Sequence, residues 1–165
     1  MPTDWNPRMQ KATAALVSLA SVAAAAAIGA SYGPQRPREA VWYAALRKPS
    51  FTPPGPAIGI AWGVLETLLC VTGYRLLTAP RGNARAAALA GWSATLAGLA
   101  GFPAVQFGAK KLGSSTAVAG AMLASSAATA ATAAQADKVS AFAMTPLVLW
   151  TAFATLLSEE LWRRN

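Results

Sequence analysis

Two rows of residues in this chain have the types and the spacing to hold a flat apolar molecule. They are Ile58, Trp62 and Glu66 in one row and Pro146, Trp150 and Ala154 in the other. Because residues four apart share one face of a helix, each row places an indole ring beside smaller side chains. Aromatic side chains contact planar rings in offset or edge-on geometry. The spacing therefore predicts an aromatic slot, but tryptophans that only pack helices together or anchor them at a membrane interface would show the same pattern.

Other kinds of chemistry are excluded by what the sequence lacks. The chain has no histidine, which excludes a Ser-His-Asp triad, a histidine metal site and a histidine-ligated haem. Its one cysteine, Cys70, excludes an internal disulfide and a cysteine zinc site. No Gly-x-Gly-x-x-Gly run follows a strand-like segment, so a dinucleotide-binding fold is not expected. We therefore expect no metal site and no resident cofactor.

The charged residues show which elements must position the two rows. Only 12% of the residues are charged, while 55% are hydrophobic. Five long stretches are uncharged or carry one charge, Glu66, and they are residues 12–35, 49–74, 86–109, 112–136 and 139–158. A bilayer core about 30 Å thick needs roughly 20 mostly apolar residues for each helix that crosses it. The sequence therefore predicts an all-α fold, an integral membrane bundle of five transmembrane helices.

We expect these helices to form a single domain over residues 1–165, because the length fits one domain. The helices are expected at about 12–34, 55–77, 85–108, 113–135 and 140–160, with a first loop at 35–54. The prolines before residue 57 favour a helix start there. Two alternatives are an alanine-rich soluble bundle and a cleaved signal peptide over residues 1–30. We favour five retained spans, because polar residues do not recur every three or four positions as in soluble amphipathic helices.

Five spans place the two ends of the chain on opposite sides of the membrane. Six positive residues fall on the N-terminal side and eight on the other side, from Arg36 to Arg164. The positive-inside rule then favours a cytoplasmic C-terminus and first loop. The net charge of +8 is spread over every loop, which suits a protein flanked by anionic headgroups. We therefore expect the lipid bilayer as a partner and no nucleic acid.

Three segments carry a more specific pattern. Residues 42–55 are Trp-Tyr-Ala-Ala-Leu-Arg-Lys-Pro-Ser-Phe-Thr-Pro-Pro-Gly, and Trp62 follows them. Residues 102–111 are Phe-Pro-Ala-Val-Gln-Phe-Gly-Ala-Lys-Lys, and residues 146–158 are Pro-Leu-Val-Leu-Trp-Thr-Ala-Phe-Ala-Thr-Leu-Leu-Ser. With these segments the chain resembles the TspO/MBR family, the tryptophan-rich sensory proteins and translocator proteins, over nearly its whole length.

This resemblance implies a five-helix bacterial membrane protein, usually a dimer, that binds flat lipophilic small molecules such as porphyrins and sterols in a cavity below the first loop. The residues that match the family's pocket positions are Tyr43, Pro53, Ile58, Trp62, Phe102, Trp150 and Ala154. To these we add Trp42, which stands beside Tyr43 in the loop, and Glu66. Some family members are reported to degrade porphyrins in light, which would make Trp62 and Trp150 catalytic.

Glu66 stands where the family usually has an aromatic residue. A carboxyl group at mid-membrane is expensive and should face the bundle interior or a wet cavity. We therefore hypothesise that Glu66 lines the ligand cavity, and the alternative is that it pairs with a polar group on a neighbouring helix. The family's polar and aromatic positions are also changed at Phe51, Leu96, Leu99, Leu147 and Ser158. These changes predict a less polar cavity than in familiar members.

The helix over 85–108 has small residues four apart, at Ala90, Ala94 and Gly98. Small residues let membrane helices approach closely, and with the family analogy they predict a homodimer through this helix. Pro103 is expected to kink it near its end.

Three functions remain open. The first is a receptor or binding protein for a porphyrin, another tetrapyrrole or a sterol-like molecule, with a sensing or transport role. The second is an enzyme that degrades a bound porphyrin with light and oxygen, using Trp62 and Trp150. The third is a structural or regulatory membrane partner with a vestigial cavity.

Overall fold

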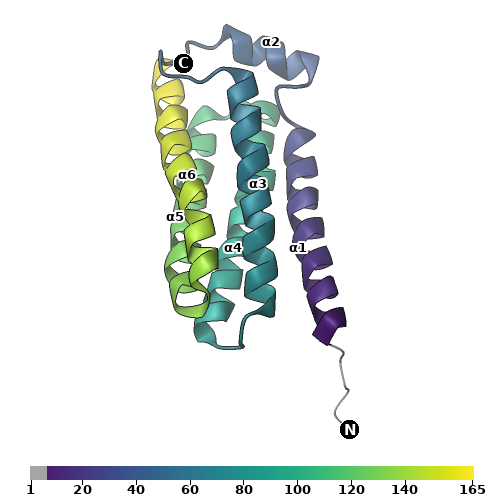
Figure 1. Ribbon diagram of the computed structural model, residues 1–165. Coiled ribbons are helices and arrows are strands. Elements are labelled where there is room, and N and C mark those ends of the chain that lie inside the picture. The colour runs from purple at the N-terminus through teal and green to yellow at the C-terminus, as the bar shows by residue number, and fades with distance from the viewer. Residues whose placement is uncertain (1–6) are drawn as a thin grey trace.

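The computed structural model describes residues 7–165, with side chains described from residue 10. These residues form six α-helices and one π-helical turn, and no strand occurs among them. The elements are α1 (Pro7–Ala30), α2 (Pro37–Ala45), α3 (Gly55–Thr78), α4 (Asn83–Pro103), η1 (Ala104–Gly108), α5 (Leu112–Ala136) and α6 (Lys138–Arg164). The five long helices run side by side along the bundle, and the short α2 lies across one end of it, where the C-terminus also lies (Figure 1).

The side chains show that this bundle is built for a bilayer. Five of its helices have the length and composition to cross a membrane. Large apolar side chains face outward, among them Phe142 at 79% and Leu149 at 67% exposure. Small hydroxyl side chains are fully buried instead, as at Ser126 and Thr129. A water-soluble protein shows the opposite distribution, so the expected five-span membrane bundle is confirmed.

Helix α5 packs between α4 and α6 through a seam of small residues. Its buried positions recur every three or four residues, and they are Ser115, Ala119, Met122, Ser126, Thr129 and Ala133. Hydroxyl groups link the helices across this seam, with 3.0 Å between Thr95 Oγ1 and Ser125 Oγ. On the other side, Ser126 Oγ and Thr151 Oγ1 are 3.2 Å apart. Close approach and hydrogen bonds of this kind replace the hydrophobic effect, which does not drive helices together inside lipid.

Helix α1 packs on α3 and α4 in the same way. Ser18 Oγ donates a hydrogen bond to the Cys70 carbonyl at 2.7 Å. Next to it, the backbone of Gly73 lies so close to α4 that a Cβ atom there would be 2.5 Å from Trp92 Cζ2. The Trp92 ring is itself fixed, because its Nε1 donates to the Leu69 carbonyl at 3.0 Å. The absence of a side chain at Gly73 therefore sets how closely the three helices approach.

Helix α1 begins at Pro7 rather than near residue 12 and α6 runs on to Arg164, and the elements differ from expectation in three further places. Helix α1 ends at Ala30 rather than near residue 34, since Gly33 and Pro34 follow and the residue before a proline avoids the helical region. The expected loop over 35–54 contains α2, which begins at Pro37. A proline in the first helical turn loses no hydrogen bond, so Pro37 favours a helix there. Finally, Pro103 is followed by η1, whose π-type bond joins Ala109 N to the Ala104 carbonyl at 2.8 Å.

An ion pair holds the bundle together at the end opposite α2. Arg75, in the last turn of α3, donates from Nε and Nη2 to the two carboxylate oxygens of Asp137, both at 2.7 Å. Asp137 precedes α6 and also accepts from Ser140 N at 2.9 Å, which caps that helix. The guanidinium of Arg75, together with Ser140, holds the pKa of Asp137 well below its ordinary value. One carboxylate therefore joins α3 to the start of α6.

We expect Asp137→Ala to lower the free energy of unfolding by about 1–2 kcal/mol, since it removes both the pair and the cap. The estimate is modest because the Arg75 side chain is 38% exposed. Asp137→Asn keeps a capping oxygen and should lose less of the free energy of unfolding.

A carboxylate whose pKa is lowered by folding stabilises the protein above its ordinary pKa, so the contribution of Asp137 should fade as the pH falls below about 4. Thermal unfolding in detergent from pH 7 to pH 3 measures it, and equal pH profiles for wild type and Asp137→Asn would contradict this assignment.

Candidate ligand-binding cavity

A cavity of about 440 Å³ lies inside the bundle at the end covered by α2. Its walls come from α1, α3, α4, η1, α5 and α6, and its lining includes Tyr43 from α2. On the α1 side the wall is made of small residues, Ala26, Gly29, Ala30 and Gly33. Small side chains on one helix opposite large rings on the others leave space that packing does not fill. The volume is within the range of about 300–1,000 Å³ that is typical of small-molecule sites.

Seven of the nine residues expected at a ligand site line this cavity, and they are Tyr43, Ile58, Trp62, Glu66, Phe102, Trp150 and Ala154. The other two lie elsewhere. The Trp42 ring packs edge-on against Phe107 at 6.4 Å, with Lys110 Nζ at 5.6 Å from its centroid, outside the cavity lining. Pro53 lies on a separate groove. Ligand binding at all nine residues remains a prediction.

The two tryptophans of the predicted slot meet across the interface of α3 and α6. The ring centroids of Trp62 and Trp150 are 6.2 Å apart, and the ring planes are nearly perpendicular at 83°. Phe153 extends this cluster, with its centroid 5.6 Å from Trp150 and 6.3 Å from Phe51. This edge-on arrangement is favourable for aromatic rings and leaves ring faces free for a planar ligand. Phe153 was not expected at the site, although it stands within the 146–158 segment.

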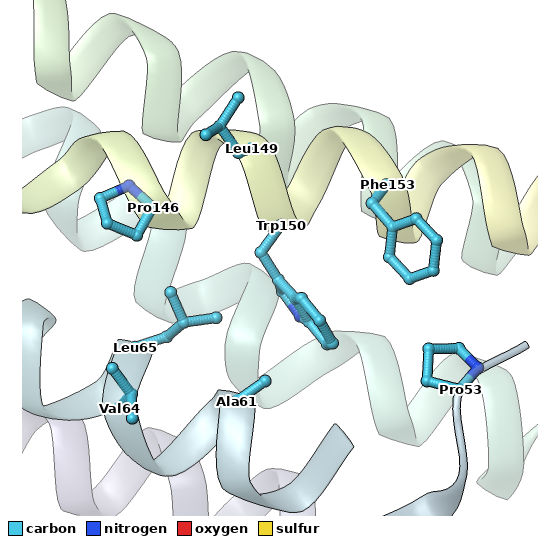
Figure 2. Close-up of a pocket in the computed structure, with 8 residues that line it drawn as sticks. All are labelled: Pro53, Ala61, Val64, Leu65, Pro146, Leu149, Trp150 and Phe153. Atoms are coloured by element: carbon cyan, nitrogen blue, oxygen red, sulfur yellow. The ribbon is translucent and has the colours of Figure 1, made fainter. Parts of the chain in front are cut away.

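A second hollow, a groove of about 540 Å³, lies on the outer side of this cluster between α3 and α6. Figure 2 shows Trp150 pointing from α6 toward α3, with Pro53 on the nearby loop beside Phe153. The groove is lined by Pro53, Ala61, Val64, Leu65, Pro146, Leu149, Trp150 and Phe153. Since Val64 and Leu149 are exposed, the groove faces the bilayer. Trp150 and Phe153 line both hollows and therefore separate the inner cavity from the membrane.

Helix α2 forms a lid over the cavity with its Tyr43, and the loop after it joins this lid to α6. Tyr43 packs against Phe107 with 5.4 Å between ring centroids, and Lys48 Nζ lies 4.6 Å from the Tyr43 ring. Burial raises the pKa of Tyr43 above its ordinary value, so its phenol is neutral at physiological pH. The loop is fastened to the end of α6, where Arg47 N donates to Asn165 Oδ1 at 2.9 Å and Asn165 Nδ2 donates to the Arg47 carbonyl at 3.2 Å.

Two polar side chains interrupt the apolar lining. Glu66 lies on the cavity wall, and within residues 10–165 no group forms a hydrogen bond or an ion pair with its carboxyl. The alternative of a structural partner on a neighbouring helix therefore finds no support in this part of the chain. Gln106, in η1, also lines the cavity and is 3% exposed. Sequence reasoning missed Gln106, although an amide inside the apolar 102–109 stretch is a signal that could have found it.

Metal binding does not explain these residues. Within the described residues, no group of three histidine, cysteine, aspartate or glutamate side chains could hold a metal ion. The arrangement suits a mainly apolar ligand held by ring faces, with a few polar groups that orient it.

The fold and the cavity define a class: a multi-pass helical membrane protein with an aromatic, lidded cavity. Within that class the chain belongs to the TspO/MBR family, whose family model matches residues 14–163. It is 34% identical over 128 residues to the translocator protein of Homo sapiens, a match that covers 75% of each chain. It is 29% identical over 150 residues to the protein CrtK of Rhodobacter capsulatus, which covers 90% of this chain and 91% of CrtK.

A shorter match is to the tryptophan-rich protein TspO of Bacillus cereus, with 50% identity over 36 residues, or 22% of this chain and 24% of that relative. These relatives support a receptor or regulatory role in a membrane for this protein.

Proposed function

We propose that this protein binds a flat lipophilic molecule in the cavity beneath α2, and that binding serves sensing or transport. A porphyrin or related tetrapyrrole is the preferred ligand, and a sterol-like molecule is the second choice. The observation that carries the proposal is the perpendicular pair Trp62 and Trp150 on the wall of a lidded apolar cavity. A ring system that slides beside one indole face meets the edge of the other. The chain has no histidine, so a tetrapyrrole is held by shape and by aromatic faces rather than by histidine ligation.

Titration with protoporphyrin IX, followed by tryptophan fluorescence, tests this function. Purified protein in detergent should show saturable quenching, and Trp62→Phe and Trp150→Phe should each weaken binding by about tenfold, because a smaller ring loses contact area. Trp162→Phe is the matched control, since Trp162 is exposed and does not line the cavity. Absence of saturable binding would support the structural or regulatory role with a vestigial cavity instead.

The second candidate function is light-dependent degradation of the porphyrin. What favours it is the position of two indole rings on the cavity wall, where they would touch a bound, photoexcited ring. Illumination of the loaded protein in air distinguishes the two functions. Protein-dependent bleaching that disappears in the Trp62→Phe and Trp150→Phe variants supports the enzyme, whereas stable absorbance supports binding alone.

We also propose that the protein forms a homodimer through α4. Ala90 and Ala94 are exposed on this helix, whereas Gly98 packs against Met122 of its own chain, with 3.0 Å from a Cβ there to Met122 Cγ. Ala97, which is also exposed, continues the row. Ala94→Leu should convert a dimer into a monomer, as measured by the mass of the detergent-solubilised particle.

The orientation that we propose places the first loop and the C-terminus in the cytoplasm of a bacterial cell. It is supported by the excess of positive residues on that side. A reporter fused to the C-terminus tests on which side of the membrane this end of the chain lies.

A further inference from the structure

The side chain of Gln106 is a polar group on the cavity wall that the sequence did not lead us to expect there. Its Oε1 accepts a hydrogen bond from Ser115 Oγ on α5. Its Nε2 has no hydrogen-bond partner within residues 10–165, although only 3% of the residue is exposed. Since Gln106 lines the cavity, that small exposed part faces the cavity. A donor that reaches the cavity without a protein partner favours an occupant that supplies an acceptor.

One end of the amide contacts Ser115, whose single hydroxyl proton is shared between Gln106 Oε1 and a backbone carbonyl. Ser115 is fully buried, and its hydroxyl also lies 2.7 Å from the Leu112 carbonyl in the first turn of α5. Gln106 is the buried residue of η1, a π-helical turn, and turns of this kind are frequent at functional sites. A side chain fixed at one polar end presents the other end without a further loss of conformational freedom. These contacts prepare the Nε2 group for a partner in the cavity.

The same wall has a second donor without a partner, and this one is fully buried. The indole Nε1 of Trp150 is buried without a hydrogen-bond partner in the described part of the chain. Trp150 and Gln106 come from different elements, α6 and η1, and both line the cavity. Because Trp150 Nε1 is fully covered, the Gln106 amide is the donor of the two that a ligand with acceptor atoms of its own would meet.

We propose that Gln106 is a specificity-determining residue whose Nε2 group donates a hydrogen bond to an oxygen of the bound ligand. This inference rests on the proposed function and narrows the ligand class. The preferred occupant is a flat lipophilic molecule with a carbonyl or carboxylate oxygen at its edge, rather than a pure hydrocarbon ring system. Ser115 is a positioning residue, because it acts on the ligand only through Gln106.

A pair of porphyrins with the same ring and different edges tests the proposal. Protoporphyrin IX has two carboxylates, whereas octaethylporphyrin has only ethyl groups. We expect Gln106→Leu to weaken protoporphyrin IX binding about tenfold and to leave octaethylporphyrin binding within about twofold, since a lost hydrogen bond is worth roughly one factor of ten. Gln135→Leu is the control, because it makes the same change at an exposed position near the end of α5, away from the cavity.

The possible results separate this inference from the function on which it rests. If the wild type binds neither ring, both are wrong. If the wild type binds both rings and Gln106→Leu weakens neither, or weakens both equally, only the inference is wrong. Should Gln106→Leu fail to fold, Ser115→Ala keeps the amide but frees its orientation. A selective loss of protoporphyrin IX affinity in that variant supports the inference, and unchanged selectivity overturns it.

Discussion

Replacing Ala154 with tryptophan should lower the affinity for protoporphyrin IX at least about a hundredfold, or about 2.7 kcal/mol. Ala154 lies one turn after Trp150 on the cavity wall, and its small side chain is part of the space that a ligand would occupy. An indole there takes up part of this cavity, so a flat ring system and the new side chain compete for the same space. The effect exceeds that of either tryptophan-to-phenylalanine change, because those variants only reduce contact area.

The control for this experiment is Ala152→Trp. Ala152 is two residues earlier on α6 and is exposed toward the bilayer, so the same substitution adds the same volume outside the cavity. We expect wild-type affinity from Ala152→Trp and the same thermal unfolding for both variants within a few degrees. Wild-type binding by Ala154→Trp would show that the ligand does not use this cavity.

The second large effect is expected at Gly73. In an open position a glycine-to-alanine change within a helix gains up to about 1 kcal/mol. At Gly73 the new Cβ would come within 2.5 Å of Trp92 Cζ2, and the ring cannot yield because its Nε1 is bonded to the Leu69 carbonyl. Overpacking of this kind costs about 1–3 kcal/mol, so Gly73→Ala should destabilise the protein despite the helical gain.

Gly120→Ala is the matched comparison, because a Cβ at Gly120 would meet Thr155 Cγ2 at an ordinary 4.0 Å. The two alanine variants should therefore shift the midpoint of thermal unfolding in detergent in opposite directions. A stabilised Gly73→Ala protein would mean that α1, α3 and α4 approach less closely than described.

The five spans could be predicted from the sequence because their cause is local. Each span must lack charge over its own length, whatever it packs against. Helix α2 was missed because it is short and lies within an expected loop, where Pro37 only permits a helix that the lid contacts then stabilise. The turn η1 was missed for a similar reason, since Pro103 predicts an irregularity in the helix but not its form.

The residues of the candidate site also divide into those that the sequence could predict and those that it could not. Spacing along one helix placed Trp62 and Trp150 on inward faces, and the structure brings their rings together. Trp42 is adjacent to Tyr43 in the sequence, but the rotation of α2 directs it toward Phe107 and Lys110 instead. Gln106 is positioned by a contact with Ser115 on another helix, and no pattern along one helix could show that contact.

The two ends of the bundle are fastened by contacts of different kinds. At one end the bidentate pair of Arg75 and Asp137 resists separation of the helices. At the other end the lid is held to α6 by two exposed bonds between Arg47 and Asn165. We expect the lid to open as a local event that leaves the spans in contact, with its amides exchanging hydrogen long before those of α5. For the proposed ligand we therefore expect substitutions at Arg47 or Asn165 to change its residence time more than they change the lifetime of the folded protein.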